Sequence, residues 1–269
     1  MNSGESMVRN IGITLMLLLL LSACGGNGNT LTTEGSTSAE KVMGFLSEGY
    51  EKEAGTRVNF NPTGSSAGIE SVKEGRCDIG VISRELTSEE KTALESVPIA
   101  IDTIVVVTNI ENGLNELTLA EISRIFSGEV TDWSRFGADS RPIVIIGREA
   151  GSGTRDAFET ATGLKGQCKY KQELTSAGDV ITAVKSNKNA IGYTSLESVR
   201  DNVKVLNIDG VSPTEENIKS GKYILQRQFL FVTVKGQILS GKKKEFYDFV
   251  VSGNGSKYIR LAGWIPIKA

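Results

Sequence analysis

The 269-residue chain contains no histidine. This absence removes the imidazole base of Ser-His-Asp triads and the commonest metal ligand of proteins. No cluster of residues suited to holding a metal-bound water is evident either. The sequence therefore predicts no enzyme, no catalytic residue, no metal and no cofactor.

An excess of basic residues is also lacking. Thirty Lys and Arg against 32 Asp and Glu give a formal net charge of -2, so no whole face can neutralise a nucleic-acid backbone. We exclude nucleic acid as a partner, and any bound anion must be met locally. The hydrophobic content of 39% suffices for real cores in one large domain or two ordinary ones.

The N-terminal apolar run is too short to cross a membrane. It covers residues 11–21, about eleven residues against the roughly 20 that a spanning helix needs. Arg9 precedes it and small residues end it, as in a secretion signal. Leu21-Ser22-Ala23-Cys24 resembles a bacterial lipobox, which implies cleavage before Cys24 and a lipid on its thiol. We predict a lipoprotein signal peptide over residues 1–23 and a lipid-anchored protein on the extracytoplasmic face of the cell membrane; an ordinary signal peptide is the alternative.

Cysteine is scarce, and the residues after Cys24 are polar and rich in glycine. We expect a flexible tether over residues 24–32 and a folded body from Thr33. The remaining cysteines, Cys77 and Cys168, could pair in an oxidising compartment, but we expect them in different domains.

The body alternates short apolar runs with helical patterns, which is typical of an α/β fold. Strands are expected at residues 57–61, 77–83, 99–109, 141–147 and 229–234, and helices at residues 37–54, 65–74, 88–96, 119–126 and 152–162. The runs 99–107 and 225–233 are too apolar for loops and could cross between domains. Residues 244–259 have helical spacing and are expected to return to the first domain.

Three turns rich in small residues each precede an expected helix. They are Glu34-Gly35-Ser36-Thr37-Ser38, Thr63-Gly64-Ser65-Ser66-Ala67-Gly68 and Gly151-Ser152-Gly153-Thr154. A helix N-terminus has unpaired N–H donors and a partial positive charge, so three converging turns could surround a tetrahedral anion. Ordinary helix capping is the alternative for any single turn.

The third turn carries the strongest signal, because Arg148 lies at the end of the strand before it. A fixed guanidinium fork suits phosphate oxygens, and Glu149 could orient it; a surface Arg-Glu pair is the alternative. The turn lacks the spacing and the lysine of a nucleotide loop. It also lacks a histidine to activate a serine.

These motifs resemble the PstS-type phosphate-binding proteins of ABC importers, together with Asp78-Ile79-Gly80-Val81-Ile82-Ser83-Arg84 and Ile125-Phe126-Ser127-Gly128-Glu129-Val130-Thr131-Asp132-Trp133. The resemblance covers nearly the whole mature sequence. It implies a two-lobe periplasmic-binding-protein-like fold of type II, with the ligand in the interdomain cleft. We expect lobe 1 over residues 33–105 and 231–269, and lobe 2 over residues 106–230.

Carried over residue by residue, the resemblance implies a phosphate site of Thr37, Ser38, Ser65, Ser66, Ser83, Arg148, Ser152, Gly153 and Thr154. Long-form relatives have an aspartate near Ser83 that accepts a phosphate proton. Here Ser83 or Glu149 must accept instead, which bears on discrimination against sulfate. Arg84 either adds charge at the cleft mouth or only pairs with a surface carboxylate such as Glu85 or Glu89.

The sequence thus predicts a monomeric binding protein that delivers inorganic phosphate to ABC permease subunits. Sulfate, molybdate or tungstate is the alternative within that class. A secreted serine hydrolase or phosphatase using Ser65 or Ser152, and a lobe used for sensing or adhesion, are alternatives from other classes.

Overall fold

The structure, a computed structural model, describes residues 30–200, 203–251 and 253–267. The chain divides into residues 1–30 and residues 31–269, and the second unit is described here. The predicted signal peptide and the predicted lipid anchor Cys24 lie outside the described residues.

Strand β1 (Thr30–Gly35) begins earlier than the expected start of the body at Thr33. Leu31 is buried in the core, and the backbone N–H of Thr32 donates to the carboxylate of Asp78 at 2.8 Å. Leu31 and Thr32 therefore belong to the folded body and not to the tether.

One sheet runs through the unit in the order β2-β1-β3-β11-β4-β8-β6-β7, with β9 and β12 also pairing with β4. Its further strands are β2 (Arg57–Asn61), β3 (Ile79–Ile82), β4 (Leu94–Asn109), β6 (Val144–Arg148), β7 (Gln172–Leu174), β8 (Ala190–Ser195), β9 (Val203–Val205), β11 (Gln226–Val234) and β12 (Ile265–Pro266). A separate small sheet pairs β5 (Glu116–Leu117) with β10 (Asn207–Ile208).

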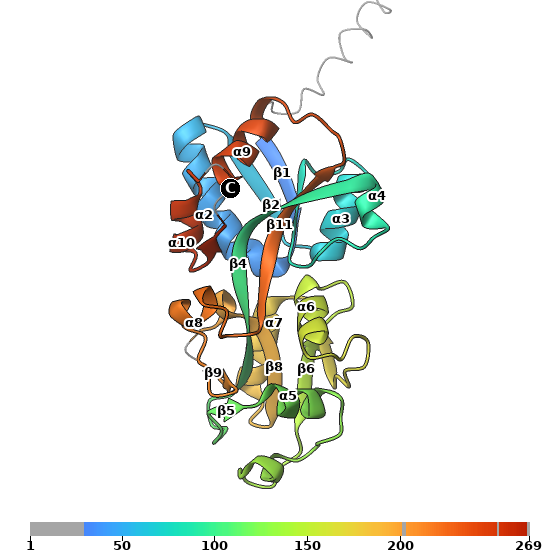
Figure 1. The fold of residues 1–269 in the computed structure, drawn as a ribbon, viewed down its shortest axis with the longest axis vertical. Coiled ribbons are helices and arrows are strands. Elements are labelled where there is room, and N and C mark those ends of the chain that lie inside the picture. The colour runs from blue at the N-terminus through green and yellow to red at the C-terminus, as the bar shows by residue number, and fades with distance from the viewer. Residues whose placement is uncertain (1–29, 201–202, 252, 268–269) are drawn as a thin grey trace, which may run out of the picture. The chain divides into compact units, whose positions relative to one another are not determined.

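Strands β4 and β11 pair antiparallel along most of their length, from Leu94 opposite Val234 to Thr103 opposite Gln226. They lie side by side and link two groups of elements (Figure 1). On one side β11 pairs with β3, and on the other β4 pairs with β8. The prediction that these two apolar runs cross between domains is confirmed.

Each group of elements has its own hydrophobic core. We call first lobe the elements that pack around Leu46, Phe231 and Phe246, together with the smaller cluster around Ile69. The second lobe packs around the cluster that contains Trp133. The predicted α/β two-lobe fold is confirmed.

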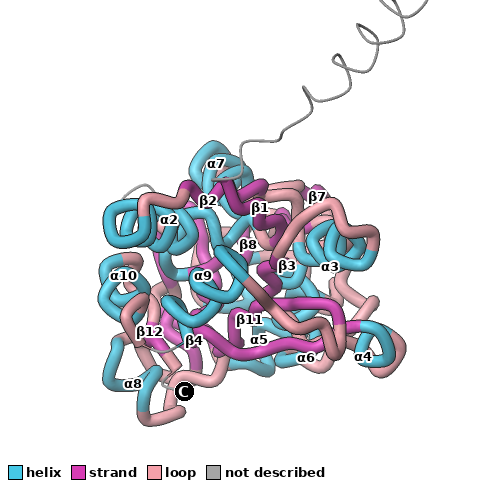
Figure 2. The backbone as a smooth tube through the Cα atoms, turned by 90° about the horizontal axis from the view of Figure 1, so that it is seen from above, coloured by secondary structure: helices cyan, strands magenta, loops and turns pink. Residues whose placement is uncertain are grey.

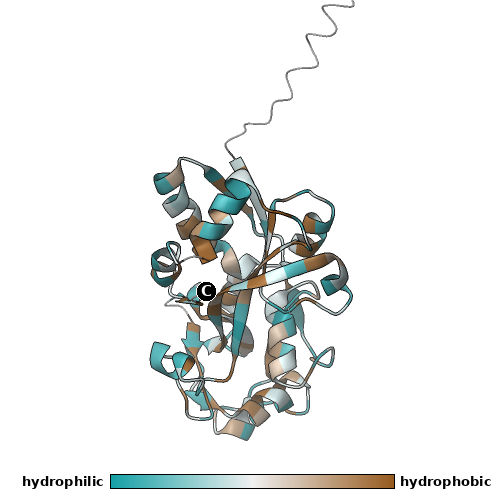
Figure 3. Cartoon of the chain, turned by 45° about the horizontal axis from the view of Figure 1, so that its top comes forward, coloured by the Kyte–Doolittle hydropathy of each residue, from teal (hydrophilic) through white to brown (hydrophobic). Residues whose placement is uncertain are grey.

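Helices lie around the strands in the view from above (Figure 2). They are α2 (Glu40–Ala54), α3 (Ser65–Lys73), α4 (Glu90–Ala93), α5 (Leu119–Phe126), α6 (Gly153–Ala161), α7 (Ala177–Ser186), α8 (Glu215–Lys219), α9 (Gly241–Val251), α10 (Ser256–Leu261) and the 3-10 turns η2 (Thr37–Ala39), η3 (Trp133–Phe136) and η4 (Leu196–Ser198). Hydrophobic and hydrophilic residues both occur along the helices, as expected where one face is buried (Figure 3). In the described part of the chain, no helix is both long and apolar enough to cross a membrane.

The helix expected at residues 88–96 is wrong in its second half. Helix α4 ends at Ala93, and Leu94, Glu95 and Ser96 pair with β11 as the start of β4. The C-terminal helices do return to the first lobe, where Phe246 and Ile259 are buried.

The two cysteines of the folded body are free. Cys77 packs in a first-lobe cluster, whereas Cys168 packs against the second-lobe core. The expectation that they lie in different domains is confirmed, and the disulfide alternative is wrong.

Candidate functional site

Two of the three turns come together through close backbone contacts at the end of β1. The N–H of Gly64 donates to the carbonyl of Gly35 at 2.8 Å. A Cβ on Gly68 would lie 2.6 Å from the carbonyl oxygen of Glu34, so α3 reaches β1 only because residue 68 is glycine. Glycine spacing thus brings the first two helix starts side by side.

Ser83 joins these turns from the end of β3. Its Oγ lies 3.0 Å from the Oγ of Ser36 and 3.2 Å from the Oγ of Ser65, and its N–H donates to Ser65. All three serines are buried. Their hydroxyls form a connected group, and each can donate or accept.

The third turn meets this group from the second lobe. The N–H of Ser66 donates to the carbonyl of Gly151 at 3.2 Å. A Cβ on Gly153 would lie 2.4 Å from the Oγ atoms of both Ser65 and Ser83, so only glycine fits here. The Oγ of Ser38 lies 3.0 Å from the Oγ1 of Thr154. The structure brings the predicted segments of both lobes together.

Among the hydroxyl groups of the three turns, one caps a helix and another has no hydrogen-bond partner within the described residues. Ser152 caps α6, accepting from the N–H of Arg155 at 3.3 Å. The N-caps of η2 and α3, Ser36 and Gly64, make no side-chain capping bond. In the described part of the chain, the buried Oγ1 of Thr37 has no hydrogen-bond partner. The capping alternative therefore accounts for Ser152 and leaves an unsatisfied hydroxyl at Thr37.

Arg148 is held at the end of β6 and is only 1% exposed. Its Nε donates to the carbonyl of Leu174 at 3.1 Å, and its Nη2 donates to that of Thr175 at 2.8 Å. Glu149 stands 3.7 Å from Nη2. Burial lowers the pKa of Arg148, and the attraction of Glu149 opposes that shift. The alternative of a surface Arg-Glu pair is wrong, because the guanidinium is buried.

A network behind Arg148 fixes its backbone. The hydroxyl of Tyr193 accepts a hydrogen bond from the N–H of Arg148 at 3.2 Å. The side chain of Arg155 donates to the carbonyl of Arg148 at 3.0 Å. Arg155 also pairs with Glu159 at 2.7 Å and lies over the ring of Tyr170. These contacts hold the positive charge at one place.

Arg84 does not point its charge at this site. It forms a two-bond ion pair with Glu90, with both N–O distances at 2.8 Å, and donates to the carbonyl of Glu85. Arg84 therefore pairs with a carboxylate, as the second alternative expected, but the partner is Glu90 and not Glu85 or Glu89. Glu90 takes the place because its carboxylate also accepts from the N–H of Thr87.

Sequence reasoning missed three buried residues near this junction. Ser36 belongs to the first turn but was not assigned to the site. Asp102 and Arg227 form an ion pair at 2.7 Å on the crossing strands β4 and β11. The sequence did contain a signal for the ion pair, because one charged residue stands in each of the apolar runs 99–107 and 225–233.

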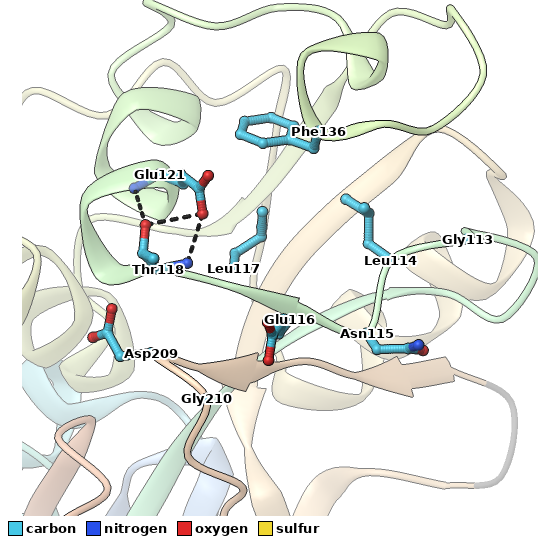
Figure 4. A pocket seen from close by; sticks show the side chains of 10 residues that line it. All are labelled: Gly113, Leu114, Asn115, Glu116, Leu117, Thr118, Glu121, Phe136, Asp209 and Gly210. Carbon is cyan, nitrogen blue, oxygen red and sulfur yellow. Dashed lines mark hydrogen bonds between the residues drawn. The ribbon is translucent and has the colours of Figure 1, made fainter.

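Another hollow, away from these turns, is acidic. It measures about 900 Å³ and is lined by Glu116, Glu121 and Asp209 (Figure 4). Glu121 completes the capping box of α5 with Thr118, and Asp209 accepts from the N–H of Leu119. Glu121 and Asp209 are thus engaged with the local backbone, and the three acids together disfavour an anion. No group of three potential metal ligands occurs in residues 30–200, 203–251 and 253–267.

A smaller hollow of about 600 Å³ opens beside Thr37 and Ser38. Lys41, Lys185 and Arg200 line it. Glu40 and Glu197 line it as well, and Glu197 pairs with Lys41, so the lining has an excess of one positive charge beside the first turn.

The chain is similar to known binding proteins along nearly its whole length. The profile of the PBP superfamily domain matches residues 22–254. A Clostridium perfringens protein, assigned as a phosphate ABC transporter substrate-binding protein and solved with bound phosphate, is 37% identical, with a TM-score of 0.83 over 89% of this chain and 100% of its own. An ABC-type phosphate transport receptor from Vibrio cholerae is 33% identical, with a TM-score of 0.72 over 87% of this chain and 99% of its own.

A curated relative extends the match over the full sequence. Phosphate-binding protein PstS of Borreliella burgdorferi is 26% identical over 95% of this chain and 97% of its own length. The superfamily profile covers well over half of the chain, and the Clostridium protein is matched throughout. The chain belongs to the PBP superfamily and, within it, to the PstS-type phosphate-binding proteins.

Proposed function

We propose that this protein captures inorganic phosphate between its two lobes and delivers it to the permease subunits of an ABC transporter. The observation that carries the proposal is the buried, fixed guanidinium of Arg148 beside converging turns of both lobes. The proposed ligands are Thr37, Ser38, Ser65, Ser66, Ser83, Arg148, Ser152, Gly153 and Thr154. We also propose lobe 1 over residues 33–105 and 231–269 and lobe 2 over residues 106–230.

The arrangement supports capture by closure. Donors of the first lobe (Ser38, Ser66) meet the third turn directly at Thr154 and Gly151. An anion that enters between them accepts hydrogen bonds from both lobes only when they are close together, so it stabilises the closed state. Most of the affinity then comes from charge-assisted hydrogen bonds shielded from water.

The proton of the bound anion needs an acceptor. The Oγ of Ser83 lies within a group of hydroxyls whose donor directions are not fixed, so it can accept from phosphate while donating to Ser36 or Ser65. Phosphate has a proton to offer at neutral pH and sulfate has none. This supports phosphate over sulfate, molybdate or tungstate, although a hydroxyl discriminates less sharply than a carboxylate.

The protein is a non-enzymatic solute-binding protein, as are the members of its family. Ser152 is occupied as a helix cap, and Ser65 bonds to Ser83. Within the described residues, neither serine contacts a side chain that could act as a base.

The proposal also includes a monomer tethered by a lipid on Cys24, after cleavage of residues 1–23. The lipobox resemblance supports the tether, and anchoring would keep the binding protein near its permease. The test expresses the full-length precursor in cells supplied with a radioactive fatty acid. We expect the protein to become labelled and the Cys24→Ala variant to remain unlabelled. Equal labelling of both would contradict the anchor.

Calorimetry on the folded body tests the central claim. We expect heat on titration with phosphate and little competition from sulfate at equal concentration. A folded protein that gives no heat with phosphate would contradict the proposed function. Equal competition by sulfate would mean that the site binds tetrahedral oxyanions in general and not phosphate specifically.

A further inference from the structure

A row of polar residues crosses five neighbouring strands where the two lobes meet. In the sheet order β3-β11-β4-β8-β6, three strands stop at this row. Ser83 follows the end of β3, Ser195 ends β8 and Arg148 ends β6. The two strands that continue through it carry Arg227 and Asp102. The strands of the pair thus lie between the strands that lead to Ser83 and Arg148.

Arg227 is held rigidly within this row. Its Nε and Nη2 donate to one oxygen of Asp102 at 2.8 and 2.7 Å, and Ser195 donates to the other oxygen at 2.6 Å. Its guanidinium carbon lies 5.0 Å from the centre of the Phe229 ring. The side chains of Arg227 and Asp102 are only 3% and 1% exposed.

The third nitrogen of the Arg227 guanidinium, Nη1, takes no part in these hydrogen bonds. Nη1 of Arg227 is buried and has no hydrogen-bond partner within the described residues. An unsatisfied charged donor in the interior is costly, and native proteins rarely retain one without a role. The hydrogen bonds of Nη1 are therefore available to a group that is not part of the protein.

Electrostatics connect this group with Arg148. Burial lowers the pKa of Arg148, and the positive charge of Arg227 lowers it further. Tyr193, which accepts from the N–H of Arg148, also interacts with the charge of Arg227. An anion placed between the two guanidinium groups would relieve both.

We propose that Arg227 supplies a second guanidinium donor to the anion site through its unpaired Nη1, with Asp102 and Ser195 as positioning residues. The inference rests on the proposed function and deepens it. The pair with Asp102 is neutral overall, so the effect comes from the hydrogen bond of Nη1, which is stronger to the phosphate dianion than to the monoanion. The site then selects the charge of its ligand as well as its shape.

The test compares phosphate affinity in the parent and in a variant that neutralises the pair, Asp102→Asn with Arg227→Gln. Removing both charges avoids leaving one buried and uncompensated. We expect the dissociation constant to rise by at least about tenfold at about pH 8.5, where the dianion dominates, and by less at about pH 5.5. The control is Lys257→Met with Glu53→Gln, which removes an ion pair between α10 and the C-terminal end of α2 and should leave affinity unchanged.

The outcomes separate the two proposals. A parent that does not bind phosphate contradicts the proposed function itself. A parent that binds, with a paired variant of equal affinity or with the same loss at both pH values, overturns only the role of Arg227, because a purely structural defect has no reason to follow the charge of the ligand.

A measurement on the parent covers the case in which the paired variant does not fold. Nitrogen-15 NMR of the arginine side chains, with Arg227→Lys to assign the signal, should show Arg227 shifting together with Arg148 on addition of inorganic phosphate. An Arg227 signal that stays in place while Arg148 shifts overturns the inference.

Discussion

The Oγ of Ser38 and the Oγ1 of Thr154 lie 3.0 Å apart although 116 residues separate them in the chain. One hydroxyl stands in η2 at the start of the first-lobe helix α2, and the other stands in the first turn of α6 in the second lobe. Both are buried. Their meeting couples the approach of the lobes to the completion of one group of donors.

Removing the second hydroxyl of this pair should weaken phosphate binding. Thr154→Val keeps the shape of the side chain and deletes one donor to a charged ligand, a bond of about 1.5–3 kcal/mol. We expect the dissociation constant to rise by about 10- to 100-fold in calorimetry. Thr160→Val, on the exposed side of the same helix, is the control and should bind like the parent. Equal affinities in all three proteins would remove Thr154 from the site.

Arg148→Ala should lower phosphate affinity more than the removal of any single hydroxyl group. The change removes a buried charge that is fixed by the carbonyls of Leu174 and Thr175. Losing a buried charged partner costs about 2–5 kcal/mol, so we expect phosphate affinity to fall by at least about 30-fold. Arg57→Ala, an exposed arginine of β2, is the matched control. Unchanged affinity of a folded Arg148→Ala protein would mean that the anion binds elsewhere.

The ion pair between Lys41 and Glu197 should slow the release of phosphate. Lys41 belongs to α2 and Glu197 to η4, so the 2.6 Å contact bridges the two lobes. The pair is partly exposed and worth about 0–1 kcal/mol. We expect Lys41→Met to raise the dissociation rate by about two- to fivefold in stopped-flow measurements, with a smaller difference at high salt.

The ion pair between Lys257 and Glu53 lies within the first lobe and provides the control. Lys257→Met should leave the dissociation rate unchanged. If both substitutions change the rate equally, the effect reflects overall charge and not a bridge between lobes.

Local chemistry explains why much of the site could be predicted. The three turns are short segments whose Gly, Ser and Thr residues favour helix starts whatever surrounds them. The apolar runs of β4 and β11 likewise indicate buried strands without reference to the rest of the chain. The convergence of the turns at Ser38 and Thr154 followed from family resemblance, because no local pattern encodes a contact between residues so far apart.

Pairing between distant segments explains what could not be predicted. Leu94 to Ser96 continue a helical pattern but become strand because β11 offers them partners. Arg227 meets Asp102 across 125 residues, and only the strand register makes them neighbours. Arg84 lies near several acids in sequence, and the turn at Thr87 selects Glu90 by holding its carboxylate.

That choice of Glu90 predicts a pH dependence of stability. Hydrogen bonds from Arg84 lower the pKa of Glu90 to about 2, and the N–H of Thr87 contributes to the shift. A carboxyl group whose pKa is lower in the folded protein than in the unfolded chain stabilises the fold above its unfolded value, near pH 4.5. This contribution is lost as the pH falls toward about 2.

Glu90→Gln should therefore lower the free energy of unfolding at neutral pH by about 1–2 kcal/mol, since the pair is partly shielded from water. Urea unfolding at a series of pH values checks this, with Glu85→Gln, a mostly exposed acid nearby, as the control. The gap between parent and Glu90→Gln should close between about pH 4.5 and about pH 2. A gap that is independent of pH would assign the loss to packing and not to the charge of Glu90.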